Sequence, residues 1–389
     1  MILPKGQHLA YCSNIHRGET WLETLAALEQ HTLAVRDRVC PNGPFGVGLR
    51  LSDQASRELA EPARLLDFQR WLEQNRCYVF TVNGFPFGRF HGGRVKDQVY
   101  LPDWTSEERL VYTCRLIDIL AALLPDNLEG SVSTLPGGFK GHVRDASQAR
   151  AIRANIFRCV EHAAVVRERT GRTVTLALEP EPLCHLETTD ETVLFFDRLR
   201  AEHGNDARLE QFLGVNYDAC HQSVEFEEPA KALHTLYAHN VKIRKLHLSS
   251  ALMLRPTAKA RAGLAAFAEE TYLHQVIIRT AEGQIVRYRD LDLALESARP
   301  AINPEAEEWR VHFHIPLHCP AGEWFEPTTG HLLALLDALA DNPAMCPHLE
   351  METYTWEALP PDLKAGDVVD QLTQEYAWTL RQLGARGLA

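Results

Sequence analysis

Strand-like and helix-like segments alternate along almost the whole chain, and this alternation limits the fold more than any other feature of the sequence. Nine segments have strand character, at about residues 8–14, 46–51, 77–83, 130–135, 173–178, 212–218, 243–248, 310–317 and 348–354. A closed barrel of βα units needs about eight strands. We interpret residues 310–317 as part of an excursion that follows the seventh strand.

The prediction is an α/β protein, a single (β/α)8 barrel over residues 1–389 with an inserted helix and hairpin at about residues 256–299. The hairpin is expected at 275–280 and 284–289. The alternative is an open doubly wound sheet, which carries Gly-x-Gly-x-x-Gly after its first strand. Residues 12–18 contain one glycine and lack that motif.

The fifth predicted strand ends in an acidic, proline-rich stretch that begins Glu179-Pro-Glu-Pro182. Strand alternation puts Val174, Leu176 and Leu178 on one face, and Glu179 and Glu181 on the other. A carboxylate that points into a barrel is costly unless a cation or hydrogen-bond donors meet it. The chain therefore has to supply a partner for Glu179.

Other strand ends supply carboxylate and imidazole groups in sequence order: Asp218 with His221, then His247, then Glu350 and Glu352. In a barrel, the C-terminal ends of neighbouring strands meet at one mouth. Oxygen and imidazole ligands suit Mn²⁺, Co²⁺, Zn²⁺ or Mg²⁺. The ordinary alternatives are a helix cap for Asp218, a core histidine for His247 and a buried ion pair with Lys245 for a glutamate.

Depth along the strand decides between neighbouring glutamates. Glu352 is nearer than Glu350 to the C-terminal end of its strand, so we expect Glu352 to be the ligand and Glu350 to lie deeper, paired with Lys245. Glu179 is preferred over Glu181, which lies between two prolines.

The order Glu179, Asp218-x-x-His221, His247, Glu352 resembles the xylose isomerase-like TIM-barrel superfamily, which includes ketose 3-epimerases and endonuclease IV. Residues 11–21, 49–52, 80–88, 312–316 and 350–356 look more closely like the metabolite traffic protein EboE family. The resemblance implies a divalent metal ion held by Glu179, Asp218, His247 and Glu352. It also implies a substrate contact or second metal ligand at His221.

Two departures from the family patterns bear on function. His185 stands where the epimerases have a substrate-contacting glutamate, and His312 and His314 stand where endonuclease IV has an Asp-x-His pair. Strand alternation would point His312 and His314 the same way.

Further residues at earlier strand ends are expected to shape substrate specificity: Asn14, His16, Arg50, Asn83 and Thr134. The ordinary alternative for these is loop capping. Phe85, Phe87 and Trp324 could cover an apolar part of a ligand, or could simply be packing residues.

The mechanism that we expect is metal-assisted proton transfer next to a carbonyl of a small polyol- or sugar-like substrate. Glu179 and Glu352 would exchange the proton. The alternatives are a non-catalytic metabolite-binding or traffic protein and a metal-dependent phosphodiester hydrolase.

The net charge of −12 argues against a nucleic-acid partner, because Lys and Arg drive phosphate binding. The nine cysteines are scattered, without Cys-x-x-Cys spacing, which disfavours a disulfide framework. Residues 1–5 do not begin a signal peptide, and no apolar run has the length of a membrane span. We expect a cytoplasmic protein with a small-molecule substrate, and the sequence leaves a homo-oligomer open.

Overall fold

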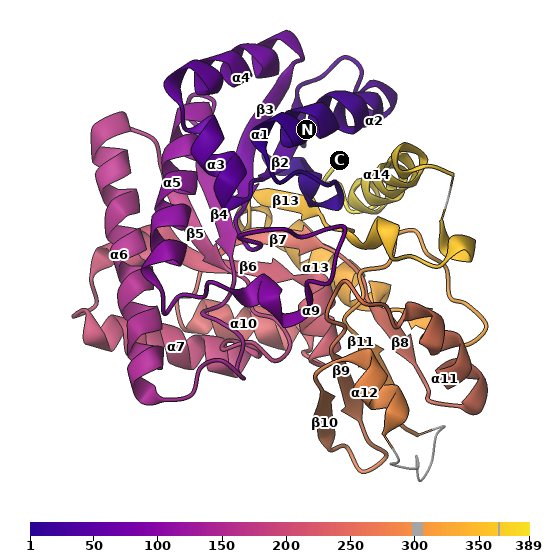
Figure 1. The fold of residues 1–389 in the computed structure, drawn as a ribbon. Coiled ribbons are helices and arrows are strands. Elements are labelled where there is room, and N and C mark those ends of the chain that lie inside the picture. The colour runs from indigo at the N-terminus through magenta and orange to yellow at the C-terminus, as the bar shows by residue number, and fades with distance from the viewer. Residues whose placement is uncertain (298–305, 365) are drawn as a thin grey trace.

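The computed structural model describes residues 1–297, 306–364 and 366–389. Eight parallel strands close into a barrel in the order β1-β13-β7-β6-β5-β4-β3-β2 (Figure 1). Their bounds are β1 His8–Cys12, β2 Phe45–Arg50, β3 Cys77–Asn83, β4 Gly130–Thr134, β5 Val174–Leu178, β6 Leu213–Asp218, β7 Ile243–Leu248 and β13 His348–Met351. The predicted (β/α)8 barrel is confirmed, and closure of the sheet excludes the open alternative.

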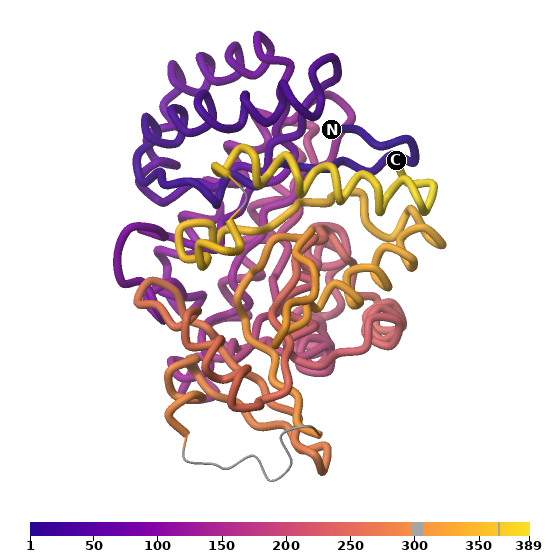
Figure 2. The backbone as a smooth tube through the Cα atoms, turned by 90° about the vertical axis from the view of Figure 1, so that its right-hand side faces the viewer, coloured from indigo at the N-terminus to yellow at the C-terminus, as the bar shows by residue number. Residues whose placement is uncertain are grey.

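Helices surround the barrel (Figures 1 and 2). They are α1 Trp21–Ala27, α2 Leu33–Val39, α3 Asp53–Leu59, α4 Pro62–Gln74, α5 Glu107–Leu123, α6 Ala146–Thr170, α7 Thr189–Glu202, α8 Ala207–Phe212, α9 Ala219–Val224, α10 Pro229–Ala238, α13 Thr329–Asp341 and α14 Val368–Gly384. The two chain ends lie close together (Figure 1), and β1 pairs with β13, the last barrel strand in the chain. No helix in the described part of the chain has the length and apolar character needed to cross a membrane.

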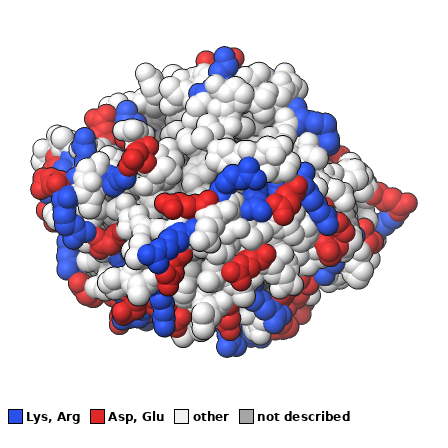
Figure 3. All heavy atoms as spheres, turned by 90° about the horizontal axis from the view of Figure 1, so that it is seen from above, with Lys and Arg blue, Asp and Glu red and all other residues white. Residues whose placement is uncertain are grey.

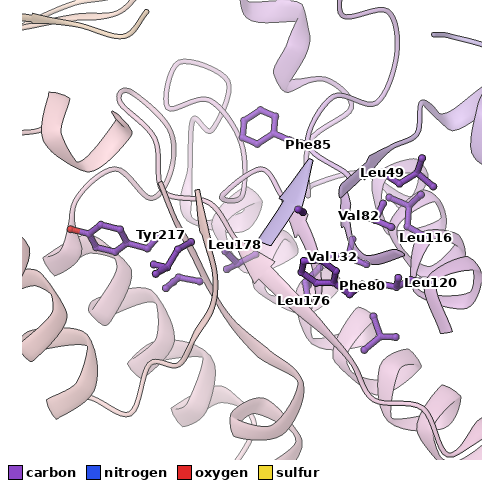
Figure 4. Packing of buried hydrophobic residues seen from close by; sticks show 14 of the residues in the cluster. Leu49, Phe80, Val82, Phe85, Leu116, Leu120, Val132, Leu176, Leu178 and Tyr217 are labelled. Atoms are coloured by element: carbon purple, nitrogen blue, oxygen red, sulfur yellow. The ribbon is translucent and has the colours of Figure 1, made fainter. Parts of the chain in front are cut away.

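The barrel strands alternate between an apolar outer face and a polar inner face. Leu176 and Val132 lie on the outer side, near Leu116 and Leu120 of α5 (Figure 4). Inside the barrel, Ser131 donates a hydrogen bond to Thr81 (2.9 Å). Because the interior is polar, charged side chains can be placed there with partners.

A second sheet follows β7, with strand order β10-β9-β11-β8-β12. Its elements are β8 Leu252–Leu254, α11 Ala258–Leu264, β9 Val276–Arg279, β10 Ile285–Tyr288, α12 Leu291–Glu296, β11 Glu308–Val311 and β12 Glu326–Pro327. It has an apolar cluster of its own, which includes Leu264, Trp309 and Phe313. We call residues 252–327 the excursion.

The excursion agrees with the expected hairpin and with the assignment of residues 310–317 outside the barrel. The strand found in this region, β11, is shorter than the expected strand at 310–317, because it ends at Val311. The second sheet begins before residue 256 and continues to Pro327. The expected end of the insertion at residue 299 lies outside the described residues.

The excursion is attached to the loop that follows β3. The backbone N–H groups of Val95 and Lys96 both donate to the Thr271 carbonyl (2.9 and 2.8 Å). The Lys96 ammonium pairs with Asp290 (2.6 Å). These contacts bring residues of the excursion to the C-terminal mouth of the barrel.

Candidate metal centre

Strand register brings the central side chains together. Asp218 at the end of β6 is paired in register with His247 on β7, and Glu350 on β13 is paired with the same histidine. Glu179 follows β5, and its N–H donates to the Thr134 carbonyl (3.0 Å), which holds it at the strand end. Glu352 directly follows β13, and its N–H donates to the Leu248 carbonyl (3.0 Å).

Three carboxylates converge on one nitrogen of His247. Nδ1 lies 3.1 Å from Glu179 Oε1, 3.1 Å from Asp218 Oδ2 and 2.9 Å from Glu352 Oε2. Glu179, Asp218, His247 and Glu352 each offer a ligand atom within 4.8 Å of the others, and all four are buried. The structure therefore brings together the four residues that the sequence suggested as ligands.

Asp218 has two roles at once. Its Oδ1 accepts from the His221 N–H (3.0 Å) at the start of α9 and from the Ser249 hydroxyl (2.7 Å). Its Oδ2 is the atom that faces His247. The helix-cap interpretation and the ligand interpretation are thus compatible.

The far side of the His247 ring is held by a buried ion pair. Nε2 lies 3.1 Å from Glu350 Oε2, and that carboxylate also pairs with the Lys245 ammonium. The predicted pairing of Glu350 with Lys245 is therefore present. Space for Glu350 comes from Gly48 of β2, where a Cβ atom would lie 1.7 Å from Glu350 Oε1. When Nε2 carries the ring proton and donates a hydrogen bond to Glu350, Nδ1 is left with a free lone pair. That lone pair faces the three carboxylates.

The electrostatics of the cluster favour a bound positive charge. Burial, with the carboxylates of Glu179 and Asp218, raises the pKa of Glu352 to about 7 against the opposing effect of His247. Burial disfavours the charged form of His247, but the carboxylates of Glu352 and Glu179 still raise its pKa well above the ordinary value. The cluster by itself therefore retains a proton near neutral pH, and a cation would compete for that place.

The residues present fit a divalent cation. Nδ1 of His247 can donate to only one of three carboxylates, and Glu179 Oε2 is buried without a hydrogen-bond partner among the described residues. Three carboxylates and one imidazole form a donor set suited to Mg²⁺, Mn²⁺, Co²⁺ or Zn²⁺.

A group of histidines lies beside the cluster. The ring of His221 is 4.6 Å from that of His312 and 5.5 Å from that of His314, measured between centroids. His312 and His314 follow β11 in an irregular segment, and their Nε2 atoms are 3.3 Å apart. The two side chains point the same way, as expected, although neither residue lies in a strand. Asp218 or Glu181 completes further groups of potential ligands with these histidines.

A pocket opens over the carboxylates, with about 520 Å³ of empty space that includes solvent outside its mouth. Asn14 and Asn83 line it, and both donate to Glu352 Oε1 (2.6 and 3.2 Å). These two expected specificity residues therefore hold a carboxylate of the cluster.

Other expected residues lie away from this pocket. His16 contacts the Tyr11 hydroxyl and stacks on His31. Arg50 donates to the Gly18 carbonyl (2.7 Å) and ties loops together. His185 packs against Phe195 of α7 and Gly137. The expectation that these three bind substrate directly has no support in the geometry, because loop contacts use their side chains.

Thr134 and two of the aromatic residues are also used elsewhere. Thr134 accepts from the Trp104 indole (3.2 Å). Phe87 packs on Tyr112, and Trp324 packs on Phe267 within the excursion. Of the three aromatic residues suggested as a ligand cover, Phe85 alone lines the pocket.

Glu181 is the main pocket residue that sequence reasoning missed. Its carboxylate accepts from the Tyr100 hydroxyl (2.6 Å) and from Gln275 (3.2 Å), and burial raises its pKa to about 7. Alternation from Glu179 was the available signal, but Glu179 was preferred because Glu181 lies between two prolines after the strand. The loop folds back, because the Glu181 N–H donates to the Leu186 carbonyl (3.1 Å).

No family model and no curated protein matches this chain. Solved structures match over nearly the full length. A xylose isomerase-like TIM-barrel protein from Mycobacterium smegmatis in complex with magnesium is 12% identical, with 100% of both chains covered and a TM-score of 0.56. A xylose isomerase domain protein from Planctomyces limnophilus is 15% identical, with 98% of each chain covered and a TM-score of 0.54.

An L-ribulose 3-epimerase is 13% identical, with 99% of this chain and 96% of that chain covered and a TM-score of 0.51. At these identities the similarity establishes the fold alone, a (β/α)8 barrel like those of these proteins.

Proposed function

We propose that this chain is a divalent-metal-dependent isomerase or epimerase, which moves a proton at the carbon next to a carbonyl of a small polyol- or sugar-like metabolite. The observation that carries the proposal is the convergence of three carboxylates on Nδ1 of His247 beneath a pocket. The epimerase among the structural neighbours supports this choice of reaction by analogy of fold.

In this proposal Glu179, Asp218, His247 and Glu352 hold the cation. When bound, the cation would polarise a carbonyl oxygen and stabilise negative charge that develops on it. Glu179 and Glu352 would take up and return the proton, since both line the pocket.

The surrounding residues would orient these two carboxylates. Asn14 and Asn83 bind one oxygen of Glu352 and leave its other oxygen towards His247. Lys245 and Glu350 hold the far side of the imidazole. Such outer contacts set the orientation of the groups that meet the cation.

The first test is metal retention. Protein purified without chelator is expected to hold about one divalent ion per chain, and Glu352→Gln should lose it while circular dichroism shows an unchanged fold. Glu225→Gln is the matched control, because Glu225 is a buried carboxyl group outside the cluster, and burial with the neighbouring Glu187 raises its pKa to about 9. Unchanged metal affinity in Glu352→Gln would refute the proposal.

The second test is proton exchange. Dihydroxyacetone, D-fructose and D-tagatose are incubated with Mn²⁺-loaded protein in D₂O, and deuterium at the carbon next to the carbonyl is measured by mass spectrometry. Exchange that depends on Mn²⁺, Glu179 and Glu352 supports the proposal. Metal and ligand binding without exchange would favour the alternative, a non-catalytic metabolite-binding protein like the EboE traffic family.

A further inference from the structure

The pocket above the carboxylates has an aromatic wall built from three separate parts of the chain. Phe90 lies in the loop after β3, Tyr272 lies in the excursion, and Tyr354 follows β13. Their ring centroids are 5.4 Å apart for Phe90 and Tyr272, 5.1 Å for Phe90 and Tyr354, and 5.3 Å for Tyr272 and Tyr354. We call these three residues the aromatic wall.

The aromatic wall is held in place by contacts that use its polar edge. The Tyr272 hydroxyl contacts Nδ1 of His91, and Nε2 of the same histidine lies 2.6 Å from the Asn14 carbonyl. The hydrogen bonds from Val95 and Lys96 to the Thr271 carbonyl fix the backbone beside it. The hydroxyl of Tyr272 is thus already bonded, and its ring is the part that borders the pocket.

Apolar side chains make up much of the rest of the lining. Phe85, which stands clear of the packed leucines and valines below it (Figure 4), lines the pocket together with Val95, Val99 and Leu273. Contact between apolar surface of this kind and an apolar ligand group is favourable, whereas such a surface offers no hydrogen bond to a hydroxyl group.

Three polar side chains of the lining already donate to carboxylates of the protein itself. Asn14 and Asn83 donate to Glu352, and Tyr100 donates to Glu181. A polyol with hydroxyl groups along its whole length would therefore bury several of them against rings. A hydroxyl buried without a partner is unfavourable.

The ammonium group of the lysine in the pocket lining also binds other groups of the protein. Among the described residues that line the pocket, Lys96 is the one lysine or arginine, and it pairs with Asp290 and donates to the Glu269 carbonyl (2.8 Å). Glu179, Glu181 and Glu352 make the floor acidic. A phosphate group would meet carboxylates and rings where it needs cationic donors. On the side of the molecule seen in Figure 3, acidic and basic side chains are interspersed and form no separate basic patch.

We propose that the substrate of this pocket has two different ends: a hydroxy-carbonyl end, which meets the carboxylate cluster, and an uncharged apolar body, a ring or short hydrocarbon group, which packs on the aromatic wall. The hydroxy-carbonyl end rests on the proposed function. The apolar body rests on the pocket lining alone and narrows the substrate class to compounds without a phosphate group.

The test compares three probes that share the hydroxy-ketone end. They are dihydroxyacetone with no further body, dihydroxyacetone phosphate with a charged body, and 2-hydroxyacetophenone with a phenyl body. Binding to the Mn²⁺-loaded protein is measured by titration calorimetry. The phenyl probe is expected to bind roughly 10- to 100-fold more tightly than dihydroxyacetone, from burial of one ring. The phosphate probe should bind no more tightly than dihydroxyacetone.

Variants locate the effect. Phe90→Leu and Tyr272→Leu should each weaken binding of the phenyl probe several-fold, with unchanged affinity for dihydroxyacetone and unchanged metal content. Tyr272→Phe keeps the ring and is the matched control that should retain phenyl binding. The comparison of probes on the unmodified chain stands even where a variant fails to fold.

The outcomes separate this inference from the proposed function. Equal affinity for the phenyl probe and dihydroxyacetone, or a preference for the phosphate probe, overturns the apolar body and leaves metal-dependent chemistry untouched. Tight phenyl binding that is the same with and without Mn²⁺ supports the aromatic wall and counts against the metal-dependent function.

Discussion

Nε2 of His247 lies 3.1 Å from Glu350 Oε2, and the same carboxylate pairs with Lys245 in a fully buried interior. Lys245 and Glu350 are both 0% exposed. Burial by itself would raise the pKa of Glu350. The Lys245 ammonium and His247 outweigh this effect and lower the pKa to about 2. The Glu350 carboxylate therefore holds the His247 ring on the side opposite Nδ1, the atom that faces the other three carboxylates.

Removing one partner of that ion pair should destabilise the barrel. Lys245→Met leaves Glu350 buried without its ammonium, and we expect a loss of about 3–5 kcal/mol in unfolding free energy. The double variant Lys245→Met/Glu350→Gln should recover part of this loss, because no uncompensated charge remains. Urea unfolding measures both. Metal affinity in Glu350→Gln should fall by about 10- to 100-fold, and unchanged affinity would mean that Glu350 does not orient His247.

Gly48→Ala tests the space that Glu350 needs. The new Cβ would overlap Glu350 Oε1, whose side chain is held by Lys245 and His247 and cannot simply turn away. We expect a destabilisation of about 1–3 kcal/mol together with weaker metal binding. Gly330→Ala in α13, where a Cβ meets no atom within 4 Å, is the control and should be neutral or stabilising. Equal stability of both variants would contradict the geometry at Gly48.

Chelation should lower thermal stability. A cation present at about 100 times its dissociation constant adds about 2.7 kcal/mol to the folded state, which corresponds to a melting temperature about 3 °C higher for a domain of this size. Treatment with EDTA should remove this difference, and Mn²⁺ should restore it. Glu179→Gln should show little response to either reagent. A response as large as that of the unmodified chain would place the ion elsewhere.

Glu375 gives a pH-dependent prediction. Its carboxyl group on α14 is buried and accepts from Thr353 (2.8 Å) and Gln371 (3.0 Å), and burial raises its pKa to about 7. The folded state therefore binds the proton more tightly than the unfolded state, whose pKa is near the ordinary value of about 4.3. The contribution to stability is complete below that unfolded pKa and is lost as pH rises through 7.

Glu375→Gln removes this dependence. The variant should resemble the unmodified chain at pH 5 and be more stable at pH 8, by up to about 3 kcal/mol. Urea unfolding at the two pH values measures the difference. Glu168→Gln on the exposed side of α6 should show no such pH-dependent gain. The idea fails if Glu375→Gln loses the same stability between pH 5 and pH 8 as the unmodified chain.

Arg287 connects the hairpin of the excursion to the barrel. Its guanidinium pairs with Glu187 and with Glu225, both at 2.6 Å. Arg287→Ala should increase hydrogen exchange in residues 276–288 and leave the barrel strands protected. Lys259→Ala removes an exposed ion pair with Glu323 inside the excursion and should leave exchange unchanged. If the hairpin stays equally protected in Arg287→Ala, other contacts hold it.

Much of the candidate centre could be predicted from sequence because strand alternation and parallel strand ends are local rules. Glu179, Asp218, His247 and Glu352 each follow from the position of a residue on its own strand. The depth argument likewise paired Glu350 with Lys245. These residues lie on elements whose direction the hydrogen-bonded barrel sets.

Three residues that were expected to bind substrate have side chains outside the pocket. His185 and His16 lie on loops that turn their side chains towards Phe195 and His31. Arg50 is the last residue of β2, and its side chain donates to the Gly18 carbonyl. Glu179 was preferred over Glu181 because Glu181 lies between two prolines. In the structure, the hydrogen bond from the Glu181 N–H to the Leu186 carbonyl folds the loop so that Glu181 lines the pocket. The path of a loop depends on contacts with distant parts of the chain, which no local pattern contains.

By itself, the sequence determined the barrel and the four side chains at its mouth, since periodicity sets which face of a strand each residue occupies. Only the tertiary structure decided that Phe90, Tyr272 and Tyr354 form one wall above them. Those rings come from segments far apart in sequence, and they meet because the excursion is hydrogen-bonded to the loop after β3.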